Sequence, residues 1–367
     1  MAKTTDVFVI GGGPAGLAFA IAARQRGLDV TVADGSSPPI EKACGEGLMP
    51  DGLDALAKLG INLPHDQSHS FRGIRFISGG LSVEGNFPHA RGLGIRRTVL
   101  HNAMVERAQA VGVSLLWQTP VTGLNQEGVL LGKHFVGSHW IVGADGNNSL
   151  ACRWAGLERK SERKRIAFRR HYRISPWSDW MELYWGTKCQ IYVTPVASDE
   201  VCVAVASRDR EMRLDRGLAM FPDLVSRLRG AAWSSIERGA ISATSRLRSV
   251  HRGRVALVGD ASGAVDCITG EGLGLAFRQA EVLAECLAAG DLRRYEQEHV
   301  RLGRRPALMS RLLLALDWKA PLRQRVMRAF HADPRLFGRM IAMHVGALST
   351  LNCATNGLAL GLRMLYS

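Results

Sequence analysis

The sequence predicts an α/β protein in which a βαβ domain is interleaved with an antiparallel sheet and followed by a helical segment. Three patterns lead to this prediction. The first 35 residues run as strand, glycine-rich turn, helix and strand. Between residues 159 and 240, apolar and polar side chains alternate with the period of two that is typical of antiparallel strands. After residue 297, apolar residues recur at helical spacing among many arginines.

The composition is that of a globular protein with a basic surface. The chain has 367 residues, of which 46% are hydrophobic and 22% charged, and its formal net charge is +14. Such an excess of Lys and Arg favours nucleic acid, an anionic membrane surface or phosphate-bearing ligands as partners. The chain has no zinc-finger spacing, basic zipper or aromatic RNA-binding signature, so no nucleic-acid partner is expected.

The cysteines and the chain ends indicate a reduced, cytoplasmic protein. The seven cysteines are scattered without a CxxC pair, which supports neither a disulfide framework nor a metal site. The N-terminus enters a strand-like run without an apolar signal core. The segment 341–362 contains too many polar residues for a confident membrane span.

The N-terminal βαβ unit predicts a dinucleotide site. A buried strand at 7–10 precedes GxGxxG, Gly27 ends the following helix, and a second strand at 30–33 ends at Asp34. Such glycines allow a tight turn, close approach to a pyrophosphate and close helix–strand contact, while the helix N-terminus offers free N–H groups. The Asp34 carboxylate would accept hydrogen bonds from ribose hydroxyls. It would repel a 2′-phosphate, so NADP is disfavoured as the ligand of this site. The alternative is a glycine-rich turn in an unrelated α/β fold. The expected contacts are Gly11, Gly13, Ala15 and Gly16.

Two later stretches extend this site. In "HWIVGADGNNSL" a strand ends at Asp145, and in "RVALVGDASGAVDCITGEGLGLAF" a strand ends at Asp260 before a helix that opens near Gly272. A helix N-terminus stabilises negative charge, which suits a ligand that becomes anionic on reduction. Either acid alone could be an ordinary turn residue after a strand.

Together, these stretches resemble the flavoprotein superfamily of para-hydroxybenzoate hydroxylase, geranylgeranyl reductases and flavin-dependent halogenases over most of residues 4–290. The resemblance implies an FAD-binding, Rossmann-like domain. It implies that Asp145 and Asp260 contact FAD, that the helix at Gly272 and Leu273 faces the flavin N1–C2=O edge, that Arg97 reaches FAD and that the Val121 backbone meets adenine. Arg97 could also be an exposed residue before a helix that Thr98 caps and that runs to Ala110.

The stretch "KACGEGLMPDG" resembles the CGxG element of the geranylgeranyl reductase branch. By that match, Cys44, Gly45 and Gly47 contact the flavin. A thiol at neutral pH is mostly protonated, so Cys44 could donate a proton, pack against the ring or exclude water. A small buried residue without chemistry is an equal alternative.

The antiparallel sheet is expected to cover the flavin and form the substrate pocket. Its candidate lining residues could equally be ordinary sheet packing. Tyr192 is, with Cys44, the candidate catalytic residue. Eight Lys or Arg between 159 and 173 form either a solvated strand face or a docking site for NAD(P)H phosphates. The candidates for the pocket lining are His171, Tyr184, Trp185, Tyr192 and Thr194.

The expected FAD-binding domain comprises 1–71, 92–158 and 241–296, and the substrate domain comprises 72–91 and 159–240. The tail, 297–367, is expected to form helices that pack on the FAD-binding domain, or whose basic face touches membrane lipid as a peripheral contact. Prolines at 306, 321 and 334 are expected to separate the helices, one of which has the apolar stripe Leu308, Leu312, Ala315 and Leu316.

Two resemblances give different reactions. The stretch "QIYVTP" keeps the proline but loses most aromatics of the geranylgeranyl reductase pattern, and "SPWSDWMELYW" lacks the halogenase WxWxIP motif. The favoured function is therefore an NAD(P)H-dependent flavin monooxygenase that hydroxylates an aromatic or polyketide-like small molecule. The Cys44 loop favours the alternative, a geranylgeranyl-reductase-like enzyme that acts on a C=C bond of a lipophilic substrate. A non-enzymatic flavin-bearing protein is the third hypothesis.

Overall fold

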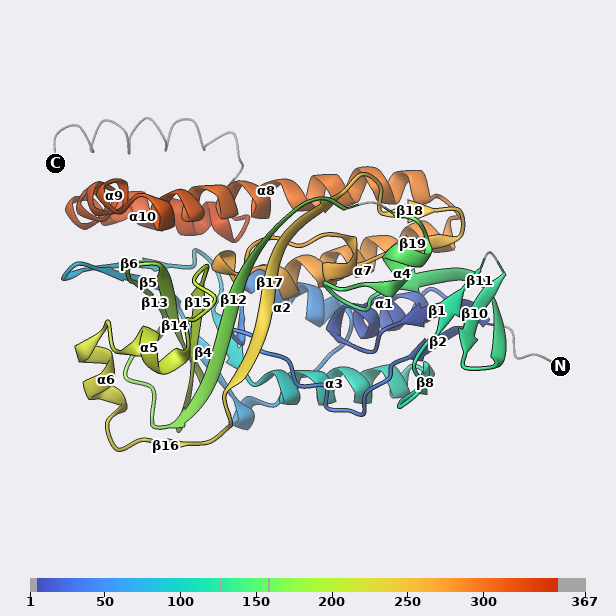
Figure 1. Cartoon of the computed structure of the whole chain (residues 1–367), viewed down its shortest axis with the longest axis horizontal. Helices are drawn as coiled ribbons and strands as arrows, with labels where there is room; N and C mark the ends of the chain where they lie inside the picture. The colour runs from blue at the N-terminus through green and yellow to red at the C-terminus, as the bar shows by residue number, and fades with distance from the viewer. Residues whose placement is uncertain (1–4, 126, 158, 349–367) are drawn as a thin grey trace.

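The computed structural model describes residues 5–125, 127–157 and 159–348. Two large β-sheets lie at opposite ends of an elongated molecule, and a long helix runs along both (Figure 1). The α/β class with an interleaved antiparallel sheet and a helical C-terminal segment, predicted from the sequence, is confirmed.

The first sheet has the order β18-β19-β11-β1-β2-β8, with β10 paired to β11 and β9 to β10. The pairs from β19 to β8 along this order are parallel, and those of β18, β9 and β10 are antiparallel. Buried Val, Ile and Phe fill the predicted first strand. Helices α1, α3 and α7 pack against this sheet and form its main apolar core. The bounds are β1 (Thr5–Ile10), α1 (Pro14–Arg24), β2 (Val30–Ala33), α3 (Arg97–Ala110), β8 (Ser114–Leu116), β9 (Gly123–Leu124), β10 (Gly128–Leu131), β11 (His134–Gly143), α4 (Leu150–Trp154), β18 (His251–Arg252), β19 (Val255–Leu257), η2 (Gly259–Ser262) and α7 (Gly272–Ala288).

The second sheet has the order β16-β12-β15-β14-β13-β5-β6, and β17 pairs with β12. It is antiparallel apart from β13 with β5. Because β5 and β6 come from before α3, the chain crosses between the two sheets. The bounds are β5 (Gly73–Ser78), β6 (Leu81–Asn86), β12 (Arg159–Arg173), β13 (Trp180–Trp185), β14 (Cys189–Ala197), β15 (Glu200–Ser207), α5 (Leu214–Leu218), α6 (Pro222–Leu228), β16 (Ala232–Trp233) and β17 (Arg238–Leu247).

The domain boundaries expected from the sequence stay a prediction; the one at 240/241 falls inside β17. A small third sheet, β3-β7-β4, joins the two ends of the molecule, because β4 and β7 also pack on β14. The bounds here are β3 (Gly47–Leu48), α2 (Pro50–Lys58), η1 (His65–Gln67), β4 (Ser68–Phe71), β7 (Gly92–Ile95) and η3 (Cys267–Thr269).

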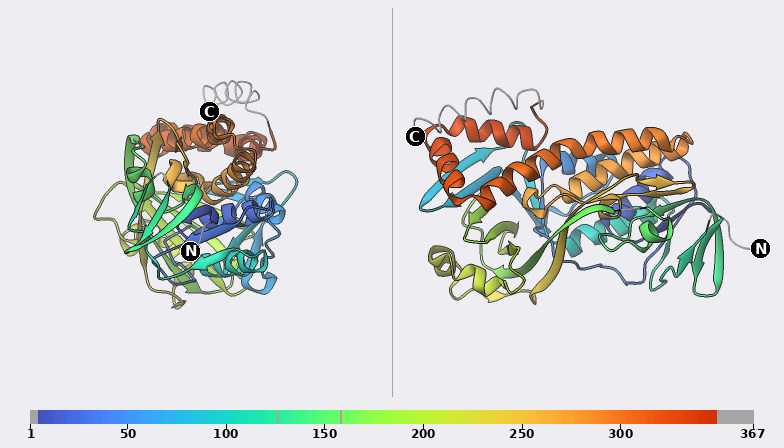
Figure 2. Two further views of the ribbon diagram at one scale, coloured as in Figure 1. Left: turned by 90° about the vertical axis from the view of Figure 1, so that its right-hand side faces the viewer. Right: turned by 45° about the horizontal axis from the view of Figure 1, so that its top comes forward.

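The tail forms α8 (Leu292–Trp318), α9 (Ala320–Ala332) and α10 (Pro334–His344). Figures 1 and 2 show α8 beside α7 and the three helices over the second sheet. The prediction that Pro306 separates two helices is wrong: Pro306 is buried inside α8. Packing against α7 and the second sheet outweighs the cost of the proline, which is about 3 kcal/mol.

The predicted apolar stripe of this tail is also displaced. The side chains buried in α8 include Met309, Leu313 and Leu316, whereas Leu312 is 44% exposed. The expected tail packing is on the FAD-binding domain, but the apolar face of α8 also covers the second sheet, whose core includes Phe76. Because leucines occupy neighbouring positions along α8, the sequence alone does not determine which of them face the second sheet.

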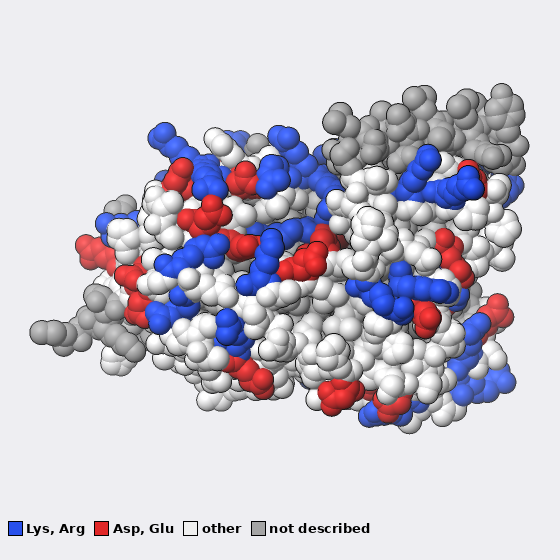
Figure 3. Space-filling view, turned by 180° about the vertical axis from the view of Figure 1, so that it is seen from behind, with Lys and Arg blue, Asp and Glu red and all other residues white. Residues whose placement is uncertain are grey.

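No helix in the described part of the chain is long and apolar enough to cross a membrane. The segment 341–362 lies partly outside the described residues. On the face drawn in Figure 3, Lys and Arg lie among Asp and Glu rather than in one continuous basic surface.

Candidate functional site

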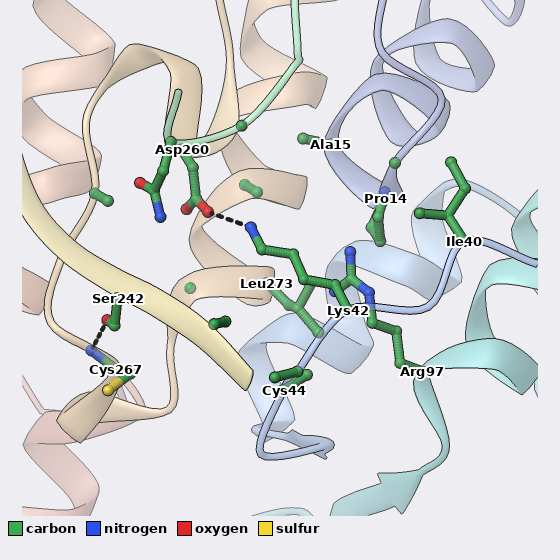
Figure 4. A pocket seen from close by; sticks show the side chains of 18 of the residues that line it. Pro14, Ala15, Ile40, Lys42, Cys44, Arg97, Ser242, Asp260, Cys267 and Leu273 are labelled. Atoms are coloured by element: carbon green, nitrogen blue, oxygen red, sulfur yellow. Dashed lines mark hydrogen bonds and ion pairs between the residues drawn. The ribbon is translucent and has the colours of Figure 1, made fainter. Parts of the chain in front are cut away.

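A cavity of about 620 Å³ lies where the two large sheets face each other. It is bordered by strands β12, β14, β15 and β17 and, as Figure 4 shows, by the start of α1, the loop before β3 and the start of α7. Of the site residues predicted from the sequence, it brings together Gly11, Gly13, Ala15, Asp34, Cys44, Gly45, Gly47, Arg97, Val121, Asp145, Tyr192, Asp260, Gly272 and Leu273. Gly16 does not line it.

The three glycines of the GxGxxG motif have different tasks. Gly11 has φ +110°, and a Cβ there would lie 2.6 Å from the Ala144 carbonyl oxygen. A Cβ on Gly16 would lie 2.0 Å from the Gly11 carbonyl oxygen, so this position requires glycine for packing of the helix on the turn. A Cβ on Gly13 would meet no described atom within 4 Å. It would instead project into the cavity, so glycine at this position lets a ligand approach the protein backbone closely.

Polar contacts hold this turn in place. The Gly12 N–H donates to Asp34 Oδ2 at 2.8 Å, and the Ser36 N–H donates to Asp34 Oδ1 at 2.8 Å. His101 is fully buried with Nε2 2.8 Å from the Gly12 carbonyl oxygen, so Nε2 carries the donated proton. Burial lowers the pKa of His101, which keeps the ring neutral. Asp34 thus shapes the turn as well as facing the cavity.

The cavity wall near α1 is suited to an anion. Gly13 is the N-cap of α1 and Pro14 follows it, so the first helical N–H groups lack partners within the helix. Arg97 extends from the start of α3 into the cavity (Figure 4), and its Nε is buried without a hydrogen-bond partner among the described residues. An unpaired buried guanidinium atom and free amides fit the pyrophosphate of a dinucleotide.

The two acids that follow strands differ in what they offer a ligand. Both Asp145 oxygens are engaged by the start of α4, accepting from Ser149 Oγ at 2.5 Å and from the Leu150 N–H at 2.7 Å. Asp145 therefore contributes mainly backbone to the cavity. Asp260 is partly exposed, and Lys42 reaches across the cavity to lie 3.4 Å from its Oδ2 (Figure 4).

The start of α7 offers a second positive helix end. Its N-cap is Glu271, and Gly272 has no described atom within 4 Å of an added Cβ, so backbone alone faces the cavity there. Glu271 is buried and points away to Arg305, at 3.1 Å. The helix end is thus free to stabilise negative charge on a flavin edge.

The loop 44–47 lies under the cavity in a tightly held form. The Glu46 N–H donates to Cys44 Sγ at 3.4 Å, and Thr194 Oγ1 donates to the Gly45 carbonyl oxygen at 2.8 Å. A Cβ on Gly47 would lie 3.0 Å from Met181 Sδ. The backbone of Glu46 itself has φ +58°, a left-handed conformation that residues other than glycine seldom adopt. Cys44 is therefore presented to the cavity by a constrained backbone.

Of the aromatic and polar candidates on the second sheet, only Tyr192 lines the cavity. Its hydroxyl is buried with no hydrogen-bond partner among the described residues, and burial raises its pKa well above the ordinary value, so it stays protonated. Tyr184 donates to Glu182 at 2.8 Å and Trp185 packs in the core, as the packing alternative predicted. His171 binds Glu46, from below the loop.

For three arginines of the basic run on β12, neither interpretation is correct, whereas Lys164 and Arg173 are exposed as the solvated-face interpretation expects. Arg165, Arg169 and Arg170 are buried and ion-paired, at 2.9 Å to Asp266, 2.5 Å to Glu41 and 2.9 Å to an aspartate of α5, respectively. They form neither a solvated face nor a free phosphate site. The acids that neutralise them come from distant segments, which a linear charge pattern does not reveal. Side chains at 159, 160 and 163 lie outside the described residues.

Lys42, Glu46 and His101 are among the residues at the site that were not predicted. Glu46 also replaces the expected Thr98 cap of α3, since the N-cap is Arg96 and the Arg97 N–H donates to Glu46 Oε1 at 3.0 Å. For Glu46, the sequence offered one signal of a special role, a charged residue between the two glycines of CGEG. Lys42 and His101 had none, because their partners lie far away in the chain.

Comparisons with known proteins agree with this geometry. The model of a family described as "FAD binding domain" matches residues 4–290. The chain is 26% identical to menaquinone reductase of Mycolicibacterium smegmatis, over 93% of each chain. It is 26% identical to digeranylgeranylglycerophospholipid reductase 2 of Methanosphaera stadtmanae, over 78% of this chain and 79% of the other.

Among solved structures, the chain is similar to tetrameric 2-methyl-3-hydroxypyridine-5-carboxylic acid oxygenase, with a TM-score of 0.72 and 25% identity over 86% of this chain and 92% of the other. The superfamily resemblance and the FAD cofactor predicted from the sequence are confirmed. Free amides at two helix starts, the open face of Gly13 and the unpaired Arg97 Nε all fit FAD.

Proposed function

We propose that this protein reduces a C=C bond in a substrate with an isoprenoid chain, with NAD(P)H as electron donor. The chain belongs to the FAD binding domain family and is an FAD-dependent oxidoreductase. The names of two relatives, a menaquinone reductase and a digeranylgeranylglycerophospholipid reductase, denote enzymes for molecules with such chains. The Cys44 loop, whose CGxG pattern resembles the geranylgeranyl reductases, points the same way.

One observation carries the proposal: the cofactor cavity and an apolar crevice share the side chains of Met181 and Tyr192. The crevice lies between the second sheet and helices α8 and α10, and Met309, Leu313 and Ile341 are among its walls. Its volume is only about 20 Å³, but flexible methionines can make way for an aliphatic chain. A compact aromatic acid would have no use for this extension.

FAD, when bound, supplies the hydride for such a reaction. The chain supplies the position of the substrate and a proton. Cys44 and Tyr192 both face the cavity and carry groups that can donate a proton, and burial raises the pKa of Tyr192 well above its ordinary value. The Tyr192 hydroxyl, unpaired within the described structure, is available for a substrate or a bound water.

A hydroxylation, favoured by the sequence analysis, remains the second candidate. The similarity to an oxygenase of an aromatic acid, at 25% identity, supports it. We place it second because the constrained Cys44 loop and the apolar crevice have clear uses in reduction of an isoprenoid chain and none in aromatic hydroxylation.

The two reactions differ in the mass of the product. Purified holoenzyme is incubated with NADPH and a menaquinone in detergent, with and without oxygen, and the product is analysed by mass spectrometry. A product that keeps two added hydrogens after its quinol ring has been oxidised back to the quinone is expected, because reduction of the ring alone also adds two hydrogens. Addition of one oxygen atom, only in air, would replace this proposal with the monooxygenase.

A lipophilic substrate must be taken from a membrane, so we also propose peripheral contact through the tail helices. Leu312 and Trp318 on α8 are exposed by 44% and 47%. Sedimentation with anionic vesicles is expected to recover more protein than with neutral vesicles. Equal recovery with both would argue against the electrostatic part of this contact.

A further inference from the structure

Beneath the Cys44 loop, three side chains from distant parts of the chain form a line of short hydrogen bonds. His171 Nε2 lies 2.5 Å from Glu46 Oε2, and His171 Nδ1 lies 2.7 Å from Ser235 Oγ. Glu46 is 3% and His171 1% exposed. The family resemblance assigned no role to Glu46 or Ser235, and His171 was expected only as a candidate for the pocket lining, which it does not join.

The donors around His171 determine which ring nitrogen carries the proton. Arg169 Nη1, which can only donate, lies 3.2 Å from Nδ1. Nδ1 is therefore the acceptor, and the Ser235 hydroxyl, at the shorter distance of 2.7 Å, is the main donor to its lone pair. Nε2 carries the ring proton and donates it to the Glu46 carboxylate. The backbone N–H of His171 at 3.1 Å and Arg169 Nη1 at 3.2 Å both donate to Ser235 Oγ. Every hydrogen bond in the line therefore has one donor and one acceptor.

The two ends of this line open in different places. Glu46 lines the cofactor cavity and shares its loop with Cys44. Ser235 is only partly buried, in a surface loop between Trp233 and Ile236, whose side chains are 66% and 65% exposed. The line thus runs from the solvent side of the second sheet to the cavity.

We propose that Ser235, His171 and Glu46 form a proton path from solvent to the cofactor cavity, which recharges the acid used in the reaction. Water takes the place of Arg169 Nη1 as a donor to Ser235 Oγ, Ser235 accepts the proton of that water and passes its own to Nδ1, and Nε2 passes its proton to Glu46. One proton enters and one arrives, and no electron moves. Glu46, which lines the cavity, then gives up the proton there to the group that has protonated the substrate. Arg169 beside Nδ1 favours return of the ring to its starting tautomer.

Glu46, His171 and Cys202 also lie within 4.8 Å of one another, an arrangement that could hold a metal ion. The surroundings oppose this use. Arg169 Nε already lies 4.0 Å from Glu46 Oε1, and burial raises the pKa of Cys202 well above that of a free thiol, so the sulfur is not a thiolate. A proton path uses the same groups without removing that arginine.

The first test reads the path in the resting holoenzyme, without turnover. ¹⁵N NMR of histidine-labelled protein, with the His171 signal assigned by its loss in His171→Gln, is expected to show a neutral ring protonated at Nε2. An Nδ1-protonated or doubly protonated ring would overturn the proposal, as would one equivalent of zinc bound at this site.

The second test separates a proton path from structural support. His171→Ala is expected to lower the turnover number about 100-fold, and imidazole added to the buffer to restore part of it. Ser235→Ala is expected to lower turnover and Ser235→Thr, which keeps the hydroxyl, to preserve it. The matched control is His251→Ala: His251 lies 3.7 Å from Glu296, outside the cavity lining, so turnover should not change.

Unchanged FAD affinity is required in these variants. If His171→Ala loses flavin and imidazole restores nothing, the residue only supports the loop and the proposal fails. The inference rests on the proposed reduction, yet the two fail separately. If the wild-type enzyme adds no hydrogen to the C=C bond, the proposed function is wrong, whereas the NMR tautomer still decides the path. If reduction occurs but imidazole rescue and the Nε2 proton are absent, only the path is wrong.

Discussion

Gly13 and Gly16 belong to one motif, yet alanine at each should damage a different property. At Gly16 the new Cβ would lie 2.0 Å from a backbone oxygen of the turn, so that oxygen must move by at least about 1 Å. At Gly13 the Cβ would meet no described atom within 4 Å, and the backbone there, at φ −73° and ψ 177°, accepts alanine without strain.

The expected magnitudes follow from these distances. Overpacking of a tight contact costs about 1–3 kcal/mol or more, which outweighs the roughly 1 kcal/mol that alanine gains over glycine in a helix. Gly16→Ala should therefore lower the free energy of unfolding of the flavin-free protein. Gly13→Ala should change it by less than about 1 kcal/mol, but weaken FAD by about 2 kcal/mol, or about 30-fold in Kd.

Urea unfolding of the flavin-free proteins and titration with FAD, followed by flavin fluorescence, measure the two properties separately. A Gly13→Ala protein that binds FAD as tightly as the wild type would refute the conclusion that this position faces the ligand. A Gly16→Ala protein of unchanged stability would refute the packing argument.

Three further predictions concern buried groups. Tyr192→Phe should keep or raise the free energy of unfolding, because burying an unpaired hydroxyl costs about 1–3 kcal/mol. Turnover should fall. A lower free energy of unfolding would mean that the hydroxyl has a partner. Arg165→Met should cost about 3–5 kcal/mol in urea unfolding, because Asp266 is left charged and buried; a neutral effect would contradict the pairing. Burial lowers the pKa of His299 to about 4, so the unfolded chain binds more protons between pH 6.5 and 4. Stability should fall by up to about 3 kcal/mol as pH drops through this range, and His299→Gln should flatten that slope.

Much of the cofactor site could be predicted from the sequence because its determinants are local. The glycines, the acid after the second strand and the CGEG loop each act through their immediate backbone, and spacing along the chain fixes that backbone. Every predicted cofactor contact except Gly16 lines the cavity, and Gly16 has the packing task that its place in the motif implies.

The errors arose where a residue's partner lies far away in the chain. Charge counting along β12 could not foresee that Arg169 meets Glu41, and helical periodicity could not decide which leucines of α8 face the second sheet or that Pro306 stays within one helix. In each case, burial and pairing across the fold outweighed the local preference.

By itself, then, the sequence determined the nucleotide-binding framework, because short-range backbone geometry specifies it, and the resemblance of its motifs to a flavoprotein superfamily indicated FAD. Only the tertiary structure decided what surrounds the reacting groups. Residues 46, 171 and 235 have no common pattern in the chain, and they form one line of hydrogen bonds because folding buries them together, where an unpaired polar group would be costly.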